Sequence, residues 1–291
     1  MAQQTSTRRQ FLQTGGLAAA SLAGAAGAAQ ARAPAGRSAA SAPARRSWRI
    51  GLPTYMFKHY DLDQSIAMAL RVDVRHFCVR SNLLPLSATD EQIAAAIAKI
   101  KAAGLVPYGG GVIYMRKEAD VARAFAYSKA AGFKLITISI RPELLGVLAK
   151  HVRRYDIRAA IHNHGPEDKS WPTPRAIHAK IGKLDKRIGI CHDTGHTLRA
   201  GADPTKQTLE TAERLMDVHL KDVDAAAAKG HSTELGRGVM DIVGFLAALR
   251  KMGFPGVVGI EYEKHMKDIL PGLAESVGFA RGVLAALAGG S

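Results

Sequence analysis

Cysteine and aromatic residues are both scarce in this chain of 291 residues. The two cysteines, Cys78 and Cys191, are too few and too distant in sequence for the disulfide framework of a small secreted domain. Both lie in apolar, strand-like segments, so we expect buried free thiols. Aromatic residues make up 6% of the chain, and none are interleaved with a dense basic stripe of the kind that single-stranded nucleic acid requires.

Acidic residues are also few, with 25 of them against 40 lysines and arginines, which gives a formal net charge of +15. Residues 1–47 hold six arginines and neither aspartate nor glutamate. The excess of positive charge in the rest of the chain is scattered among the predicted helices, which argues against a nucleic-acid partner. The apolar fraction of 47% and the charged fraction of 22% are those of a soluble globular protein.

Residues 1–47 are typical of targeting and linker sequence. Arg8 and Arg9 precede an Ala/Gly-rich stretch over 15–29, and Ala29-Gln30-Ala31 has the small-x-small pattern of a cleavage site. This order resembles a twin-arginine signal, and about 15 apolar residues are fewer than the roughly 20 that span a bilayer. We expect a signal peptide over 1–31, a flexible linker over 32–47, export to the periplasm, and no membrane attachment after cleavage.

From Trp48 onward, short β-rich runs alternate with longer helical patterns. The clearest helix, over 89–103, begins with a Thr-Asp-Glu cap and ends before Gly104. Eight alternating units predict a parallel α/β sheet closed into a (β/α)8 TIM barrel, a single domain over 48–291. An open doubly wound sheet competes, but Gly51-Leu52-Pro53 lacks the glycine-rich phosphate turn which that fold favours. The predicted strands are 49–55, 74–80, 106–113, 135–140, 157–162, 188–193, 217–221 and 256–262.

Four consecutive predicted strands end in groups that bind metals or move protons. In a (β/α)8 barrel the active site lies at the carboxyl ends of the strands, so these groups should converge. Side chains alternate between the two faces of a strand, which places His162 and His164 on one face and points His192 outward. The mixed nitrogen and oxygen set predicts one divalent ion, Mn, Co, Zn or Fe, in preference to calcium. The predicted ligands are His162, Asp193, His219 and Glu261.

The motifs at these ends resemble the xylose isomerase-like TIM barrel superfamily over residues 48 to about 285. The motifs are His162-Asn163-His164-Gly165-Pro166, Asp193-Thr194-Gly195-His196, Val218-His219-Leu220-Lys221-Asp222 and Gly259-Ile260-Glu261-Tyr262. The superfamily includes sugar and sugar-phosphate isomerases and epimerases, inosose dehydratase, dehydroshikimate dehydratase and endonuclease IV.

The resemblance implies a ligand set with one departure. The ketose epimerases hold their metal with Glu, Asp, His and Glu from strands five to eight, and Asp193, His219 and Glu261 match the last three. His162 stands where the strand-five Glu is expected, so a mechanism with two glutamates does not carry over intact. The His-x-His pattern is closer to the inosose dehydratase branch. In the family the position of His196 approaches the substrate.

The chemistry that the resemblance implies is proton removal next to a metal-polarised carbonyl, which gives an enediolate. We expect Glu261 to be the base, His164 a second proton-handling group and Lys221 a fixed cation that stabilises the enediolate. The function expected is therefore isomerisation or epimerisation of a sugar, keto-sugar or related polyol. Elimination by a lyase or dehydratase acting on a keto-sugar or keto-glycoside is the alternative.

Three further residues are candidates for substrate contacts on the loops: Arg141, Glu143 and Arg237. A small carbohydrate is the expected partner, with no nucleic acid, and an oligomer is compatible with the sequence. An endonuclease IV-like nuclease is a remote alternative, since three zinc ions need ligands from early strands that are absent here. A sugar-binding protein without turnover also stays open.

Overall fold

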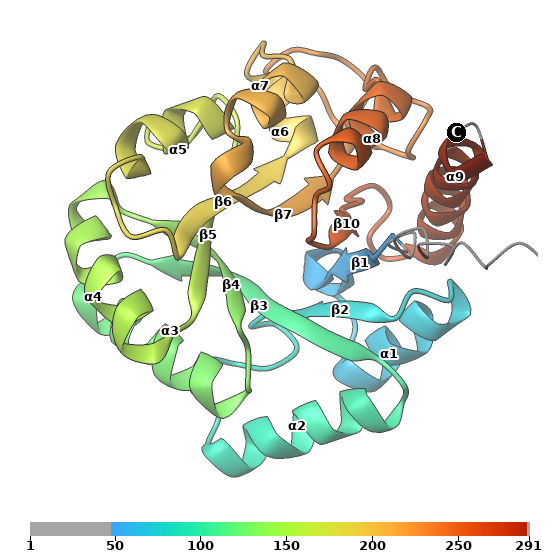
Figure 1. Ribbon diagram of the computed structural model, residues 1–291. Helices are drawn as coiled ribbons and strands as arrows, with labels where there is room; N and C mark the ends of the chain where they lie inside the picture. The colour runs from blue at the N-terminus through green and yellow to red at the C-terminus, as the bar shows by residue number, and fades with distance from the viewer. Residues whose placement is uncertain (1–47, 290–291) are drawn as a thin grey trace, which may run out of the picture. The chain divides into compact units, whose positions relative to one another are not determined.

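The computed structural model describes residues 48–289, and the expected signal peptide and linker lie outside them. The described residues form a closed parallel barrel with helices around it, as the sequence predicts (Figure 1). The strand order around the barrel is β1-β10-β7-β6-β5-β4-β3-β2. The strands are β1 (Ile50–Pro53), β2 (His76–Val79), β3 (Val106–Met115), β4 (Leu135–Ile140), β5 (Arg158–His162), β6 (Ile188–Asp193), β7 (Leu215–Leu220) and β10 (Val258–Ile260).

Helices follow the strands and cover the outside of the barrel (Figure 1). The predicted helix 89–103 appears as α2 (Asp90–Ala102), whose N-cap Thr89 and N3 residue Gln92 form a capping box. The other helices are α1 (Leu62–Arg71), α3 (Glu118–Ala130), α4 (Leu145–Tyr155), α5 (Pro174–Ile181), α6 (Thr194–Arg199), α7 (Pro204–Glu210), α8 (Ile242–Lys251) and α9 (Leu270–Gly289). Short 3-10 turns occur at η1 (Thr54–Phe57), η2 (Pro142–Leu144) and η3 (Ala212–Arg214).

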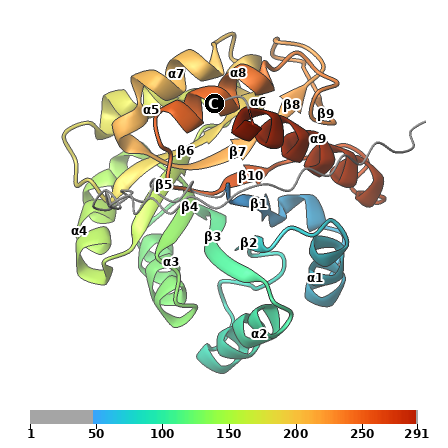
Figure 2. The same cartoon turned by 45° about the vertical axis from the view of Figure 1, so that its right-hand side comes forward.

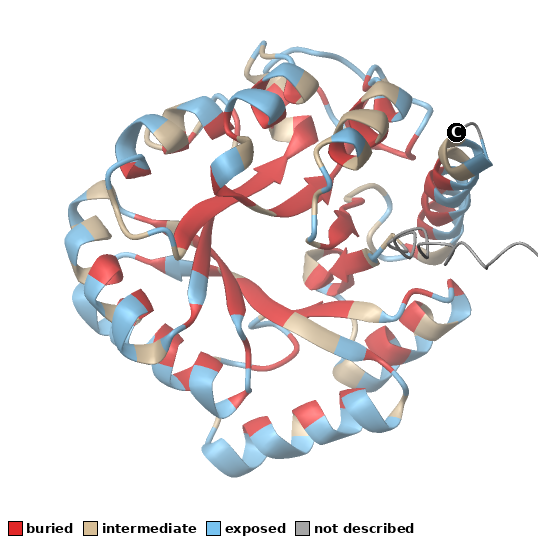
Figure 3. Ribbon diagram, in the orientation of Figure 1, coloured by how far each residue is buried: buried red, intermediate tan, exposed pale blue. Residues whose placement is uncertain are grey.

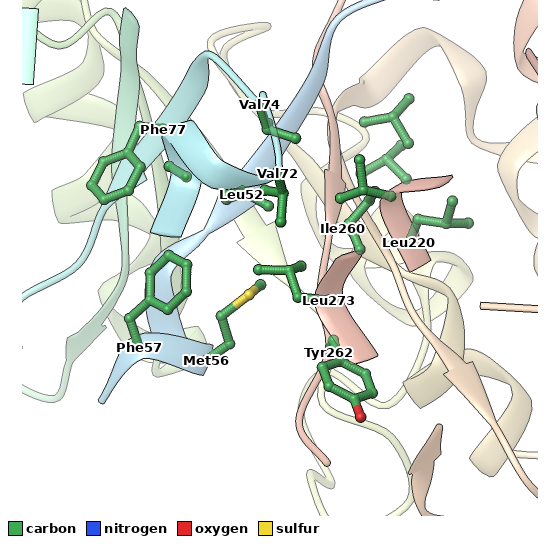
Figure 4. Close-up of a cluster of buried hydrophobic side chains, with 14 of the residues drawn as sticks. Leu52, Met56, Phe57, Val72, Val74, Phe77, Leu220, Ile260, Tyr262 and Leu273 are labelled. Atoms are coloured by element: carbon green, nitrogen blue, oxygen red, sulfur yellow. The ribbon is translucent and has the colours of Figure 1, made fainter. Parts of the chain in front are cut away.

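The hydrophobic core lies between the barrel and the helices. Figure 3 shows buried residues along the strands and on the inward sides of the helices, with exposed residues on the outer helix faces. Figure 4 shows one part of this core, where Phe57 and Phe77 stack with ring centroids 6.4 Å apart. The last helix, α9, lies beside α8 (Figure 2) and buries Leu273 and Val277. By length and composition α9 could cross a membrane, but here it packs as a barrel helix.

The loop between β7 and α8 carries a small antiparallel hairpin of β8 (Asp222–Val223) and β9 (Ser232–Thr233). Its end is fixed by Glu234, which is buried and accepts hydrogen bonds from Tyr262 (2.7 Å) and Lys264 (2.8 Å). Ser232 Oγ also accepts a hydrogen bond from the backbone N–H of Glu263. The hairpin therefore holds the segment that follows β10, at the end of the barrel where the predicted ligands lie.

Candidate metal centre

The four predicted ligands converge in the structure. Potential ligand atoms of all four residues lie within 4.8 Å of one another, and every one of the four side chains is buried. The register explains the convergence, since His162 pairs with Cys191 on β6 and Asp193 pairs with His219 on β7. Glu261 directly follows β10, the neighbour of β7. Adjacent parallel strands thus bring the four groups to one end of the barrel.

The spacing of the ligand atoms fits a single ion. Ligand atoms about 2.1 Å from an ion lie about 3.0 Å apart at right angles and about 3.4 Å apart in a tetrahedron. The Nε2 atom of His162 is 3.0 Å from Nδ1 of His219 and 3.6 Å from Oδ2 of Asp193. The same Nδ1 of His219 is in close contact with Oε2 of Glu261. These donors form a cluster consistent with a metal site.

One oxygen of the buried Asp193 carboxylate accepts no hydrogen bond from residues 48–289. Oδ1 of Asp193 caps α6 by accepting the backbone N–H of His196 at 2.8 Å. Oδ2 is buried and accepts no hydrogen bond, and it faces the ammonium of Lys221 at 3.2 Å and the imidazole of His162 at 3.6 Å. A buried carboxylate oxygen without a hydrogen bond is costly, and a metal cation bound among these groups would coordinate it.

Short polar bridges fix the strand ends that carry the cluster. The Asn163 side chain exchanges hydrogen bonds with the backbone of Asp193, donating at 3.0 Å and accepting at 2.9 Å. Thr194 makes the same kind of exchange with the backbone of Lys221. The side chains of β5, β6 and β7 are therefore held in one arrangement before any ligand binds, which favours tight metal binding.

Lys221 lies inside the same polar cluster. Its ammonium is 3.2 Å from Oδ2 of Asp193, 3.1 Å from Oε1 of Glu261 and 3.4 Å from Oε2 of Glu263. Burial alone would lower the pKa of Lys221, but the three carboxylates outweigh it and raise that pKa well above its usual value. The lysine is thus a permanent cation. Its stem packs against Gly195, where a Cβ would come within 2.7 Å of it.

The electrostatic environment differs between the two ligand histidines. Burial and the neighbouring imidazoles lower the pKa of His162 well below its ordinary value, so its ring is neutral. Burial acts the same way on His219, but the adjacent Glu261 carboxylate raises its pKa overall. Burial would raise the pKa of Glu261, yet Lys221 and His219 hold it well below the usual range. Glu261 is therefore ionised, as metal binding requires.

Asp217 is a buried carboxylate that the sequence analysis did not single out. Its Oδ2 lies 3.8 Å from Nε2 of His219, on the side of the ring away from the cluster. Thr137 donates a hydrogen bond to the same oxygen, and the backbone N–H of Val218 donates to Oδ1. Burial raises the pKa of Asp217 to about 6. Its position two residues before His219, on the same face of β7, was the available signal.

A cavity of about 230 Å³ opens beside the cluster. His164 and His196, both predicted to act on the substrate, line it together with three of the ligands. The Nδ1 atom of His164 is 3.4 Å from Asp168, and Arg199 contacts His196 at 3.1 Å. The wall also contains Glu263, two residues past Glu261, and three polar residues that were not predicted from the sequence, Tyr55, Arg80 and Tyr114.

The three predicted substrate-binding residues lie farther from the cluster. Arg141 lines a neighbouring groove with Tyr114 and Trp171, and Glu143 is exposed in η2. Arg237 is exposed and pairs with Glu275 at 2.8 Å. None of the three is among the residues that line the cavity. His192, expected to point outward, is buried against Phe245 of α8 and contacts the hydroxyl groups of two threonines, Thr197 and Thr208.

Comparisons with known proteins point to the same superfamily as the sequence motifs do. The sequence model of the xylose isomerase-like TIM barrel matches residues 140–282, which include all four ligand candidates. The rhizopine catabolism protein MocC of Rhizobium meliloti is 26% identical over 160 residues, covering 46% of this chain and 49% of that protein. Inosose dehydratase of Geobacillus kaustophilus is 32% identical over 92 residues, covering 26% of this chain and 30% of the enzyme. The chain thus matches half or less of the length of these curated relatives.

Solved structures share the fold over most of the chain. A xylose isomerase domain protein from Planctomyces limnophilus superimposes with a TM-score of 0.67 at 19% identity, covering 83% of this chain and 98% of that one. D-allulose 3-epimerase from Methylomonas sp. gives a TM-score of 0.65 at 14% identity, covering 82% and 98%. At identities this low, the superpositions show only that these proteins share the barrel fold.

Proposed function

We propose that this chain, which belongs to the xylose isomerase-like TIM barrel superfamily, is a divalent-metal-dependent isomerase or epimerase of a sugar, keto-sugar or related polyol. The observation that carries the proposal is the convergence of four buried ligand atoms beside a cavity at the carboxyl end of the barrel. His162, Asp193, His219 and Glu261 would hold the ion. When bound, the ion would polarise a substrate carbonyl and make the adjacent C–H more acidic.

The chain's own groups supply the proton transfers. Glu261 lines the cavity as an ionised carboxylate and is the proposed base that removes the proton. The buried ammonium of Lys221 is fixed beside it and stabilises the negative charge that develops on the enediolate. His164 follows β5, which β6 and β7 separate from β10 in the barrel, so it approaches a bound substrate from another side. Return of the proton from that side would complete an epimerisation.

A lyase or dehydratase is the second candidate. The observations in its favour are the 32% identity to inosose dehydratase and the imidazole of His162 where the epimerases have a carboxylate. The same base would remove the proton, and a hydroxyl or glycosidic group would then leave. The described residues contain two groups of potential ligands, and these share His162 and His219, so they mark one site and lend no support to a three-zinc nuclease.

The first experiment measures the metal. The purified protein should contain about one divalent ion per chain by elemental analysis. His219→Ala and Asp193→Ala should each lose it, because the remaining ligands are too few to retain the ion. His178→Ala is the control, since His178 pairs with Glu213 outside the cavity. Full metal occupancy in both ligand variants would contradict the proposed site.

The second experiment identifies the reaction. Metal-loaded protein is incubated in D₂O with a panel of keto-sugars and keto-glycosides and followed by proton NMR. Deuterium entering next to the carbonyl without elimination supports the isomerase or epimerase, whereas an unsaturated product supports the lyase. Glu261→Gln should lower turnover about 100-fold or more. Glu275→Gln, which removes a carboxylate bound to Arg237 outside the cavity wall, should leave turnover unchanged.

A further inference from the structure

Arg80 is a cation in the wall of the cavity that has no carboxylate partner. It directly follows β2, on the side of the barrel opposite β6, and lines the cavity with Tyr55 and Tyr114. Within residues 48–289 no aspartate or glutamate oxygen lies within 4.0 Å of its guanidinium. Lys221, in contrast, contacts three carboxylates. The positive charge of Arg80 is therefore available to a ligand.

The guanidinium group of Arg80 is held in place by its surroundings. Its central carbon lies 4.0 Å from the centre of the Tyr55 ring, so one face of the group stacks on the tyrosine. The N–H donors lie in the plane of the group and are not used by this stacking. The backbone N–H of Arg80 donates to Oγ1 of Thr54 at 3.0 Å, and the buried Thr54 in turn donates to the carbonyl of Cys78. Stacking and backbone anchoring together keep the donors oriented before a ligand binds.

The carboxylates that follow β10 already have a cationic partner, Lys221. Glu261 and Glu263 follow β10, and both lie within 3.4 Å of the ammonium of Lys221. Glu261 also contacts His219. A neutral sugar would leave the donors of Arg80 facing only hydroxyl groups. A ligand with one negative charge at its far end would pair with them through two parallel hydrogen bonds.

We propose that the substrate is a sugar acid whose carboxylate binds Arg80 while its carbonyl and hydroxyl groups lie at the metal cluster. This inference rests on the proposed function and names its substrate class. A carboxylate matches the planar fork of one guanidinium, whereas a phosphate dianion would leave a second charge without a partner. The cavity of about 230 Å³ is smaller than the roughly 300 Å³ or more of sites for drug-sized ligands, which suits a monosaccharide acid.

The test compares matched ligands by isothermal titration of the metal-loaded protein. D-glucuronate and D-glucose form one pair, D-galacturonate and D-galactose form another, and D-glucose 6-phosphate is the phosphate probe. A charged hydrogen-bonded pair corresponds to about 10- to 100-fold in affinity, so the wild type should bind at least one acid about 10-fold more tightly than its neutral partner. It should also prefer that acid to the phosphate.

Variants of Arg80 show whether this residue causes the preference. Arg80→Met should remove the preference for the acid and change the affinity for the neutral sugar by less than about twofold. Arg80→Lys keeps the charge without the planar fork, so it should retain part of the preference. Arg154→Met is the matched control, because Arg154 also stacks on a tyrosine, Tyr155, but lines a separate pocket.

Four results would overturn the inference. The first is a wild type that binds no acid more tightly than its neutral partner, which includes binding neither of them. The second is an Arg80→Met variant that keeps the preference for the acid. The third is an Arg80→Met variant that loses affinity equally for the acid and the neutral sugar. The fourth is tighter binding of the phosphate through Arg80, which would refute a carboxylate as the group that Arg80 binds. Metal uptake is titrated separately on each protein. Failure to bind metal refutes the proposed function, whereas normal metal uptake with no effect at Arg80 refutes the sugar-acid inference alone.

Discussion

The buried carboxylate of Asp217 provides the sharpest test of how the cluster holds its ion. Nδ1 of His219 faces His162 and Glu261, so metal binding through this atom requires the ring proton on Nε2. Oδ2 of Asp217 lies 3.8 Å from that nitrogen and fixes the tautomer electrostatically. Asp217→Asn removes the charge and keeps an oxygen for the N–H of Val218. We therefore expect weaker metal binding without loss of the fold.

The size of the effect follows from the geometry. Groups that orient a ligand histidine typically contribute 10- to 100-fold to metal affinity. The separation of 3.8 Å exceeds hydrogen-bond length, which places Asp217 in the lower part of that range. We expect the metal dissociation constant of Asp217→Asn to rise about 10- to 30-fold, or about 1.4 to 2 kcal/mol.

The assay is a competition titration of metal-free protein with Co²⁺ or Zn²⁺ against a chelator of known affinity. Circular dichroism and thermal melting of the metal-free proteins check that the fold is preserved. Thr137→Val, which removes the hydroxyl that donates to Asp217 while the carboxylate stays, should shift the affinity by less than Asp217→Asn does. An Asp217→Asn variant that folds normally and binds metal within twofold of the wild type would refute the reasoning.

Three further predictions concern other parts of the chain. Cys191 belongs to an alternative group of potential ligands, so Cys191→Ala should leave metal affinity within twofold if Asp193 and Glu261 are the ligands, and a large loss would favour the alternative. Burial alone would raise the pKa of Glu234, but hydrogen bonds from Lys264 and Tyr262 lower it from 4.5 to about 2. Glu234→Gln should therefore lower the free energy of unfolding by about 1–2 kcal/mol at pH 7, and the gap should narrow as the pH falls from 4.5 toward 2 in denaturant titrations. Replacing both Arg8 and Arg9 by lysine should block export in a fractionation assay, and normal export would remove the twin-arginine assignment.

The barrel and the cluster could be predicted from the sequence because both follow from local patterns. The ranges predicted for β4 and β6, 135–140 and 188–193, are those of the structure. Strands with β-branched runs and polar ends are recognisable, and closure of the barrel then brings their ends together. Alternation along β6 also placed Asp193 and His192 on opposite faces correctly.

The rest of the cavity wall could not be predicted in this way. Arg80 and Tyr55 occur in segments without any repeated spacing, and their meeting depends on how η1 packs beside the end of β2. The role of Arg237 was expected from loop position, but its side chain turns to Glu275 on α9, a partner that only the folded chain brings near. Long side chains on loops reach several neighbours, so their direction depends on tertiary contacts.

The order of strands around the barrel assigns metal binding and the proposed recognition of the substrate carboxylate to two different continuous lengths of chain. The potential ligands lie at the ends of β5, β6 and β7 and just after β10, whereas Arg80 and Tyr55 come from segments that follow the first strands. Two seams join these halves, one where β4 pairs with β5 and one where β1 pairs with β10. Recombination at those seams would exchange the recognition half of such a barrel as one block. New substrates could thus be acquired by half-barrel shuffling while the metal-binding half is inherited unchanged.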